Sequence, residues 1–417
     1  MKKRTFILFL PLFLVLFNAC EKQDSAEEET YEVAVPITQP IAEFRSSVKI
    51  QEPKAIIEAG KIYSYKDYVF VNDKYQGIHI IDNSDHYVPE KIAYLKIPKN
   101  VDIAVKDEML YADSGMDLVV FDISDINNIK QVERLENVFP NTNYVVPEGA
   151  AFVDNQNFDP QSEVVVGYVM ESRKIEMTDY GDDIVFFDNA AEVSYSSGGG
   201  NSGTGGSMAR FKIVSDYLYA VDQQSIMVFD ISSLTDPQKL SEEYVGWDIE
   251  TIFNEKDHLY LGSTTGMYIY SIEDPEKPAF VSRVQHVMGC DPVVVKDDIA
   301  YVTIRGGNWC GQEESELVLI DVSDKAAPQT LGAYVMENPY GLGVREDKLF
   351  VCDGTAGLKV YDLTNTPDLV LADHFQDVNT YDVIPLEDVL LMIGDNILNQ
   401  YNYKNNEVNL ISSFSLN

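Results

Sequence analysis

Apolar and polar residues along this chain form short runs that recur at a regular spacing. Seven runs share one pattern: a first residue that is often glycine or polar, then β-branched or aromatic residues, then Asp, Ser or Asn. They occupy residues 77–82, 117–122, 225–230, 266–271, 316–321 and 357–362, with a weaker copy at 397–402. Their last residues lie 40, 108, 41, 50, 41 and 40 positions apart. This spacing indicates an internal repeat of about 40 residues.

Each of these runs has neighbouring runs of the same character. Residues 109–112 exemplify the run before it, 102–105 the run before that, and 91–95 the run that follows. They are short, rich in β-branched and aromatic residues, bounded by Gly, Asp, Asn and Pro, and lack helical periodicity, as expected of β-strands. Four strands per repeat predict a propeller blade, because one thin sheet buries its faces only against its neighbours. We therefore predict an all-β fold, a seven-bladed β-propeller of four-stranded antiparallel blades over residues 57–417, with no strand borrowed to close the ring.

The third run of each repeat also resembles a known family. Residues 118–122 read Leu-Val-Val-Phe-Asp, 226–230 read Ile-Met-Val-Phe-Asp and 317–321 read Leu-Val-Leu-Ile-Asp, each followed by Ile or Val and then Ser. This pattern is similar to the LVIVD repeat, whose family consists of β-propeller-like proteins, many of them bacterial surface lipoproteins. The resemblance implies the fold from about residue 57 to residue 417. It implies no activity, because the family has no general assigned chemistry.

Most of the third runs end in an aspartate that precedes a tight turn. These residues are Asp82, Asp122, Asp230, Asp321 and Asp362. Aspartate side chains accept hydrogen bonds from nearby backbone amides in such turns, so we interpret them as structural rather than as ligands. Ser271 and Asn402 stand at the same position and can accept the same bond.

The spacing of 108 positions exceeds one repeat and places an insertion at about residues 137–207, between the second and third blades. Residues 164–169 and 184–187 are strand candidates, so we predict an insertion that bears a hairpin; an eighth, degenerate blade is the alternative. Its end, residues 198–207, is rich in glycine and has no lysine, which excludes a phosphate loop and indicates a flexible linker. We expect the insertion to overhang the mouth of the central channel, because it connects a fourth strand to a first strand on the top face.

The N-terminus carries the features of an export signal. Basic residues 2–4 precede an apolar run at 6–17 that is too short to span a membrane. Residues 16–20, Leu-Phe-Asn-Ala-Cys, resemble a bacterial lipobox. We therefore expect residues 1–19 to be a signal peptide and Cys20 to be the lipidated mature N-terminus, with palmitate as an acyl group. An ordinary signal peptide with a chance cysteine is the alternative.

Residues 20–56 are expected to form the lipidated N-terminal segment before the propeller. Within it, acidic residues 21–30 have no apolar side chain larger than alanine and predict a solvated tether. An acidic cluster just after the lipidated cysteine resembles the signal by which some Gram-negative bacteria export lipoproteins to the outer leaflet. We predict an outer-membrane lipoprotein exposed at the cell surface, with a periplasm-facing lipoprotein as the alternative.

The formal net charge of the chain is −37 at pH 7. Such a charge repels nucleic acid phosphates and anionic lipid headgroups, so we exclude nucleic acid partners and expect membrane contact through the lipid alone. Cationic partners and divalent cations remain compatible with it.

Ligands of propellers usually bind on the top face, which is reached by the loops before the first strand and between the second and third strands. Acidic, aromatic and basic residues in those loops predict a binding rim. The candidates are Asp102, Trp247, Asp248, Asp291, Arg305, Tyr340, Asp353, Tyr381 and Asp382. Oxygen-rich clusters suit Ca²⁺, so a bound calcium ion is one interpretation. The other, which we favour, is that each aspartate is satisfied by its own turn.

Besides Cys20, the chain has Cys290, Cys310 and Cys352, and all three map to the same face. An exported protein permits disulfides, and we predict one between Cys310 and Cys352, leaving the state of Cys290 open. Three thiols without a convincing histidine make an incomplete zinc site, so no metal ligand is assigned.

No pattern assigns a catalytic residue, and we expect a binding or scaffold module with a protein, glycan or cation ligand on the top face. A glycan-directed hydrolase or lyase that uses carboxylates in the funnel is one alternative. A structural component of an outer-membrane assembly is another. Two carboxylates converging in a deep funnel without paired cations would favour the enzyme. A top covered by the insertion would favour recognition, and a wide apolar patch on the outer edges would favour the structural role.

Overall fold

The computed structural model describes residues 29–140, 146–147, 149–175, 204–285, 292–306, 314–404 and 407–417. Its elements within these residues are strands, apart from one short α-helix, α1 (Ile41–Ser46), which precedes the repeats. No helix in this part of the chain combines the length and apolar character that crossing a membrane requires. The predicted signal peptide, Cys20 and most of the predicted tether lie outside the described residues.

Six antiparallel sheets have four strands each, in simple sequence order. The first comprises β7 (Ile103–Lys106), β8 (Met109–Ser114), β9 (Asp117–Asp122) and β10 (Lys130–Leu135). The second comprises β14 (Phe211–Val214), β15 (Tyr217–Val221), β16 (Ser225–Asp230) and β17 (Gln238–Tyr244). The third comprises β18 (Ile249–Glu255), β19 (His258–Ser263), β20 (Gly266–Ser271) and β21 (Ala279–Gln285).

The other three complete the C-terminal half. They are β22 (Val293–Lys296), β23 (Ile299–Ile304), β24 (Ser315–Asp321) and β25 (Gln329–Met336); β26 (Leu342–Arg345), β27 (Lys348–Cys352), β28 (Leu358–Asp362) and β29 (Val370–Phe375); and β30 (Asp382–Pro385), β31 (Val389–Gly394), β32 (Ile397–Asn402) and β33 (Asn409–Ser415). The predicted third runs coincide with β5 (Gly77–Asp82), β9, β16, β20 and β32, and differ by one residue at the start of β24 and β28.

The N-terminal repeat forms a six-stranded sheet. Its core strands are β3 (Ala59–Tyr65), β4 (Tyr68–Asp73), β5 (Gly77–Asp82) and β6 (Glu90–Lys96). The short β13 (Thr204–Gly205) pairs with β3 on the inner edge, and β2 (Lys49–Gln51) pairs with β6 on the outer edge. Both added strands come from segments outside the repeat itself, so the sequence periodicity could not show them.

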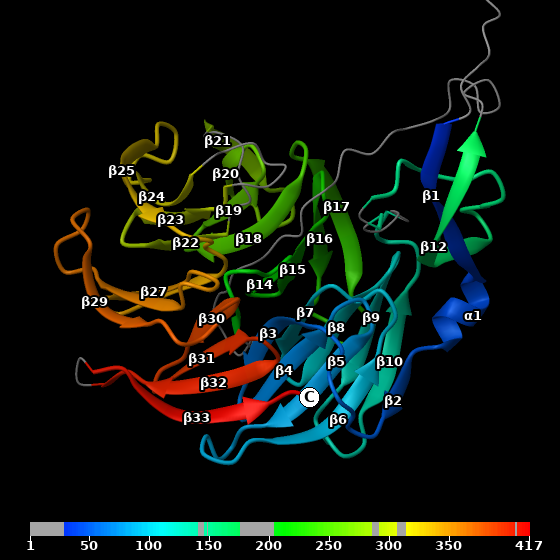
Figure 1. Ribbon diagram of the computed structural model, residues 1–417, viewed down its shortest axis with the longest axis horizontal. Coiled ribbons are helices and arrows are strands. Elements are labelled where there is room, and N and C mark those ends of the chain that lie inside the picture. Colours follow the sequence, from blue (N-terminus) through cyan, green and yellow to red (C-terminus); the bar gives the residue numbers. More distant parts are fainter. Residues whose placement is uncertain are drawn as a thin grey trace, which may run out of the picture.

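These sheets follow one another around a common axis, with their first strands innermost (Figure 1). The inner strands contact in the order β3, β7, β14, β18, β22, β26 and β30, and β30 contacts β3 again. Apolar side chains fill the space between neighbouring sheets; Ile62 and Val71 of the N-terminal sheet, for example, pack with Leu391 and Leu398 of the C-terminal sheet. Each sheet thus buries its faces against its neighbours.

The two ends of the chain join the first and last sheets directly. The backbone N–H of Ile56 donates to the carbonyl oxygen of Leu416 at 3.0 Å. The buried side-chain amides of Asn83 and Gln400 donate to each other at 3.1 and 2.7 Å. The outer strand of the last sheet is β33 from its own repeat, which agrees with the prediction that no strand is borrowed to close the ring.

A separate three-stranded sheet stands beside the ring, where β1 and β12 form a long ribbon (Figure 1). Its order is β11 (Phe152–Val153), β1 (Glu29–Pro40) and β12 (Glu163–Ile175). The predicted strand at 164–169 lies within β12, but its antiparallel partner is β1 rather than a hairpin partner in the insertion. Residues 184–187 lie outside the described residues. The last two residues of the predicted tether, Glu29 and Thr30, belong to β1.

Helix α1 connects this ribbon to the second repeat through a buried charge cluster. The guanidinium of Arg45 donates to both carboxylate oxygens of Asp117, at 2.8 and 3.0 Å, and Arg134 donates to the same carboxylate at 2.7 Å. Burial acts to raise the pKa of Asp117, but these hydrogen bonds outweigh it and hold the pKa below its usual value. Phe44 packs on Met116 and Val164 beside this cluster.

Candidate functional site

The aspartates that end the third strands have the structural role predicted for them. In each case the carboxylate accepts the backbone N–H two residues later, as Asp122 does from Ser124 at 2.9 Å. The same bond occurs at Asp82, Asp230, Asp321 and Asp362. Hydrogen bonds from the side chain and the backbone of that later residue lower the pKa of each carboxyl. Ser271 and Asn402 accept the equivalent bonds, at 3.3 and 2.9 Å.

Asp102 lies at the inner end of the second repeat and is buried. One carboxylate oxygen accepts the N–H of Ile103 at 2.8 Å, and the other accepts the N–H groups of Arg210 and Phe211 at 2.5 and 3.0 Å. Burial raises the pKa of Asp102, and the nearby ammonium of Lys61 opposes that rise. This carboxylate thus connects residues 210 and 211, just after the insertion, to the second repeat, and the ligand role of Asp102 stays a prediction.

Asp353 has a similar internal role in the C-terminal half. Its buried carboxylate accepts the N–H groups of Glu337 and Asn338 at 3.0 and 2.8 Å and the ammonium of Lys359 at 2.5 Å. Asp113 accepts the N–H groups of Val101 and Asp102 in the same way. These aspartates hold the segment before the first strand of their own repeat, as expected if each aspartate is satisfied by its own turn. The ligand role of Asp353 stays a prediction.

Residues 204–209 enter the mouth of the ring and contact several sheets. Besides the pairing of β13 with β3, the hydroxyl of Ser207 accepts the N–H of Leu342 at 2.7 Å. The N–H of Ile252 donates to the carbonyl oxygen of Ala209 at 3.0 Å, and Met208 is fully buried. We call residues 204–209 the plug. The prediction of a flexible linker is therefore wrong for residues 204–207, because residues 205–207 are buried, and Thr204 and Gly205 pair with β3.

Asp382 lies directly beneath the plug and is fully buried. A Cβ atom at Gly206 would overlap its carboxylate, so only glycine permits this approach. Burial raises the pKa of Asp382 well above its usual value, with the backbone N–H of Val383 and the charge of Lys61 opposing it. Asp382 is thus covered by the protein's own chain, and its ligand role stays a prediction.

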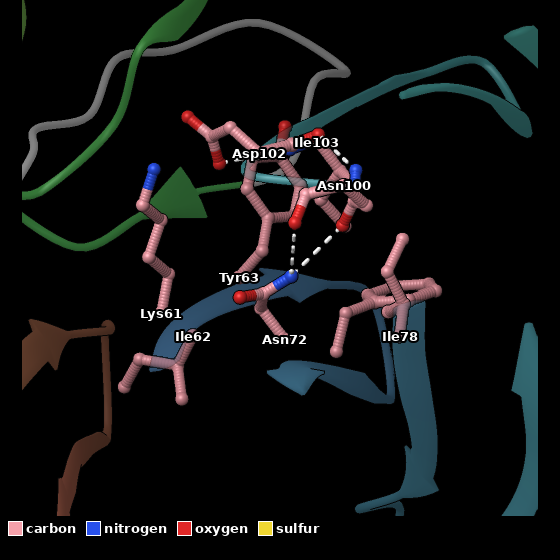
Figure 2. A pocket seen from close by; sticks show the side chains of 9 residues that line it. Lys61, Ile62, Tyr63, Asn72, Ile78, Asn100, Asp102 and Ile103 are labelled. Atoms are coloured by element: carbon pink, nitrogen blue, oxygen red, sulfur yellow. Dashed lines mark hydrogen bonds between the residues drawn. The ribbon is translucent and has the colours of Figure 1, made fainter. Parts of the chain in front are cut away.

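A small cavity lies beside this cluster between the first and second repeats. Its volume is about 10 Å³, which is room for about one water molecule. Figure 2 shows the side-chain amide of Asn72 pointing across it to Asn100, whose side-chain oxygen accepts the bond at 2.9 Å. Lys61 and Asp102 also line it. The cavity is too small for a sugar or a peptide side chain.

Three of the other predicted rim residues, Arg305, Tyr340 and Tyr381, form a stack of rings and cations across neighbouring repeats, which Lys74 joins although it was not predicted. The guanidinium carbon of Arg305 lies 4.5 Å from the centroid of the Tyr340 ring. The rings of Tyr340 and Tyr381 lie 5.3 Å apart, and the ammonium of Lys74 lies 5.7 Å from the Tyr381 ring. All four side chains are half-buried. We call them the rim stack; each cation–ring contact of this kind contributes about 0.5–1 kcal/mol.

Trp247 and Asp248 lie together just before β18. The side chain of Trp247 is 64% exposed, and exposed Asp248 accepts a hydrogen bond from Thr264 at 3.3 Å. Asp291 lies outside the described residues.

Cys352 is a free and fully buried thiol in the apolar core of its repeat. Burial raises its pKa well above the usual value. The predicted disulfide with Cys310 is therefore not formed in this structure. Cys310 and Cys290 lie outside the described residues. Among the residues described, no group of three His, Cys, Asp or Glu side chains is placed to bind a metal ion, so the calcium interpretation gains no support.

The sequence interpretation missed the buried lysines of the inner strands. Lys61 and Lys212 each interrupt an apolar first strand, and that interruption is the signal that could have identified them. Lys212 has no hydrogen-bond partner on Nζ in the described structure, and its ammonium lies 5.8 Å from the Phe253 ring. Burial lowers the pKa of Lys212 to about 7.

Replacing Lys212 by methionine is expected to raise the free energy of unfolding by about 1–2 kcal/mol near pH 6.5, because an apolar side chain avoids burying the charge. The folded pKa lies below the unfolded value of 10.5, so the unfolded state binds the extra proton between about pH 7 and pH 10.5. The free energy of unfolding of the wild type therefore rises relative to that of the variant as the pH increases. Urea denaturation at pH 6.5 and pH 9.5 measures this, and a difference that stays constant between the two would contradict it.

Sequence and structure comparisons agree with this arrangement. A model of the LVIVD repeat matches residues 99–135, 205–244 and 291–335. The chain carries LVIVD repeats. These three LVIVD matches fall on the repeats that begin with β7, β14 and β22. No curated protein sequence matches the chain.

Solved structures with a similar fold have very different sequences. A protein from Lactobacillus plantarum has 11% identity, with 86% of this chain and 96% of that chain covered and a TM-score of 0.52. BamB from Moraxella catarrhalis has 10% identity, coverage of 91% and 89%, and a TM-score of 0.45. The computationally designed Ika8 protein has 10% identity, coverage of 87% and 90%, and a TM-score of 0.48. At such identity only the fold is shared, and a propeller-like repeat fold suggests a binding or scaffold module.

Proposed function

We propose that this LVIVD-repeat protein is a seven-bladed β-propeller that acts as a lipid-anchored binding module at the cell surface. The closed order of inner strands from β3 to β30 supports the count of seven blades. In this view the N-terminal sheet is a blade with two added strands, and the residues between β10 and β14 are an insertion.

The lipid anchor is proposed from the lipobox-like sequence that ends at Cys20. Cys20 precedes Glu29, the first residue of β1, by nine positions, and nine extended residues reach about 30 Å. The lipid on Cys20 would insert into the outer leaflet of the outer membrane. The ribbon of β1 and β12 would therefore lie near the membrane surface. Replacing Cys20 by serine should release the protein from the membrane fraction, and retention of the variant would contradict the anchor.

The observation that carries the binding role is the rim stack beside a closed mouth. Because the plug fills the mouth, a ligand has to bind on the surface around it rather than in a deep funnel. The rim stack presents two tyrosine rings there, with Arg305 against one ring and Lys74, which is itself paired with Glu58 at 2.7 Å, against the other. Stacked aromatic rings of this kind suit a glycan or a protein segment. Trp247 supplies a further exposed ring on the top face.

The geometry gives the hydrolase alternative no support. Asp102 lies near Asp382, since its charge raises the pKa of Asp382, but both carboxylates are buried. Lys61 lies among them, so the pair is not free of cations. The structural alternative would be favoured by a wide apolar patch on the outer edges. The outer strands from β10 to β33 each expose only one or two large apolar side chains.

A pull-down from cell-surface extract and a glycan array, both with the purified protein, test the binding role. We expect the double variant Tyr340→Ala, Tyr381→Ala to lose at least about tenfold of the affinity, since each stacked ring contributes about 1 kcal/mol. The matched control is Tyr87→Ala, because Tyr87 is 74% exposed and lies in the turn between β5 and β6 on the opposite edge. Equal binding by the double variant and the control would contradict a ligand on the rim stack.

A further inference from the structure

The outer strand β25 ends its sheet within the described residues, so one of its edges has no strand partner. Every second residue of such an edge directs its backbone N–H and C=O outward, where another strand can pair with them. At eight residues, β25 is also the longest of the outer strands in the ring.

Charged side chains normally protect such edges, and most outer strands here have them. β10 contains Lys130 and Arg134, β17 contains Lys239 and Glu242, and β21, β29 and β6 also contain charges. β25 has none: its sequence is Gln-Thr-Leu-Gly-Ala-Tyr-Val-Met. It instead exposes Leu331 at 40% and Val335 at 73%.

β33 is also uncharged, but it is one residue shorter and less open. The hydroxyls of Ser412 and Ser413 donate to His86 and Asn399, and residue 416 is held by Ile56. β25 is therefore the outer strand best suited to accept a partner.

The chain itself shows that an outer edge of this ring accepts an added strand. Residues Lys49–Gln51 of β2 pair antiparallel with residues Tyr94–Lys96 of β6, although β2 lies outside the repeat. Ala333 and Val335 lie on one face of β25. If a strand paired with β25 as β2 pairs with β6, its side chains would cover these two residues.

We propose that β25 binds an extended peptide segment of a partner protein by strand addition, and that this segment alternates apolar residues with lysine or arginine. The net charge of −37 attracts a cationic segment and opposes pairing of two copies of this chain. The uncharged edge lets the segment approach without burying a carboxylate, and its apolar residues cover Val335. This surface is separate from the rim stack, so the proposal does not depend on the top-face function.

The test uses the purified full-length protein and a labelled peptide with four Lys-Val repeats. Fluorescence anisotropy gives the Kd, and hydrogen exchange shows which amides the peptide protects. A peptide of the same length and charge, in which two valines are replaced by proline, is the control for strand pairing. We expect protection of alternate amides in 329–336 and at least about tenfold weaker binding of the proline peptide.

Two protein variants separate strand addition from general charge attraction. Val335→Lys should weaken binding at least about tenfold, while Leu240→Lys on the already charged β17 should leave it unchanged. Both residues are exposed and both changes add one positive charge, so folding and net charge are matched. Equal effects of the two variants, binding without protection of β25, or no binding at about 1 mM peptide would each overturn the proposal.

Discussion

Replacing Asp102 by alanine is expected to lower the free energy of unfolding by about 3–5 kcal/mol. The substitution leaves three buried N–H groups, of Ile103, Arg210 and Phe211, without their acceptor. It also removes the carboxylate whose charge offsets the buried ammonium of Lys61. Urea denaturation at pH 7 followed by circular dichroism measures the loss.

A matched control is Asp216→Ala, because Asp216 is exposed and its partner Lys106 also contacts the carbonyl oxygen of Ser215. An exposed ion pair contributes at most about 1 kcal/mol, so the control should change stability little. If Asp102→Ala were as stable as this control, the carboxylate would not have the internal role assigned to it.

Replacing Gly206 by valine is expected to cost about 2–3 kcal/mol and to displace the plug from the mouth. A side chain at this position overlaps the carboxylate of Asp382, which is buried and cannot move aside without strain. Hydrogen exchange of the amides of Leu342 and Ile252 should become faster, since these N–H groups would lose their acceptors on Ser207 and Ala209. The amide of residue 206, which donates to the carbonyl oxygen of Ile62, should also exchange faster.

Gly332→Val is the control for this prediction, because Gly332 lies in β25 and has open space where a Cβ atom would be placed. It should leave both the stability and the exchange of the plug close to those of the unchanged protein. Unchanged, slow exchange of the amides of Leu342, Ile252 and residue 206 in Gly206→Val would show that the plug is not held by contact with Asp382.

The sequence predicted the repeat and its strands because both depend on local patterns. The run at 77–82 and the turn after Asp122 contain the apolar alternation and the hydrogen-bonding side chain that define them. The family resemblance at 118–122 rested on the same residues, and LVIVD matches fall on three of the repeats.

Contacts between distant segments could not be predicted in this way. The strand at 164–169 was visible, but its partner β1 lies more than 120 positions away and has no matching signal. Glycine-rich residues 204–207 have the composition of a linker, and only the approach of Gly206 to Asp382 shows that they are held.

The rim shows the same limit at the level of single side chains. Arg305, Tyr340 and Tyr381 were predicted for one face, and they do contact one another there. Asp102 and Asp353 were predicted for that face too, but backbone N–H groups and Lys359 satisfy their carboxylates. Whether an aspartate is available to a ligand depends on which N–H groups and cations of distant segments lie beside it. The sequence alone does not show these contacts.

The repeats close into a ring, with the first sheet packed against the last. A double-mutant cycle on Asn83 and Gln400, which are 317 positions apart and hydrogen-bonded to each other, measures that contact directly. Asn83→Ala, Gln400→Ala and the double variant should give a coupling free energy of about 1–2 kcal/mol. A coupling near zero, with each single variant folded, would contradict a closed ring.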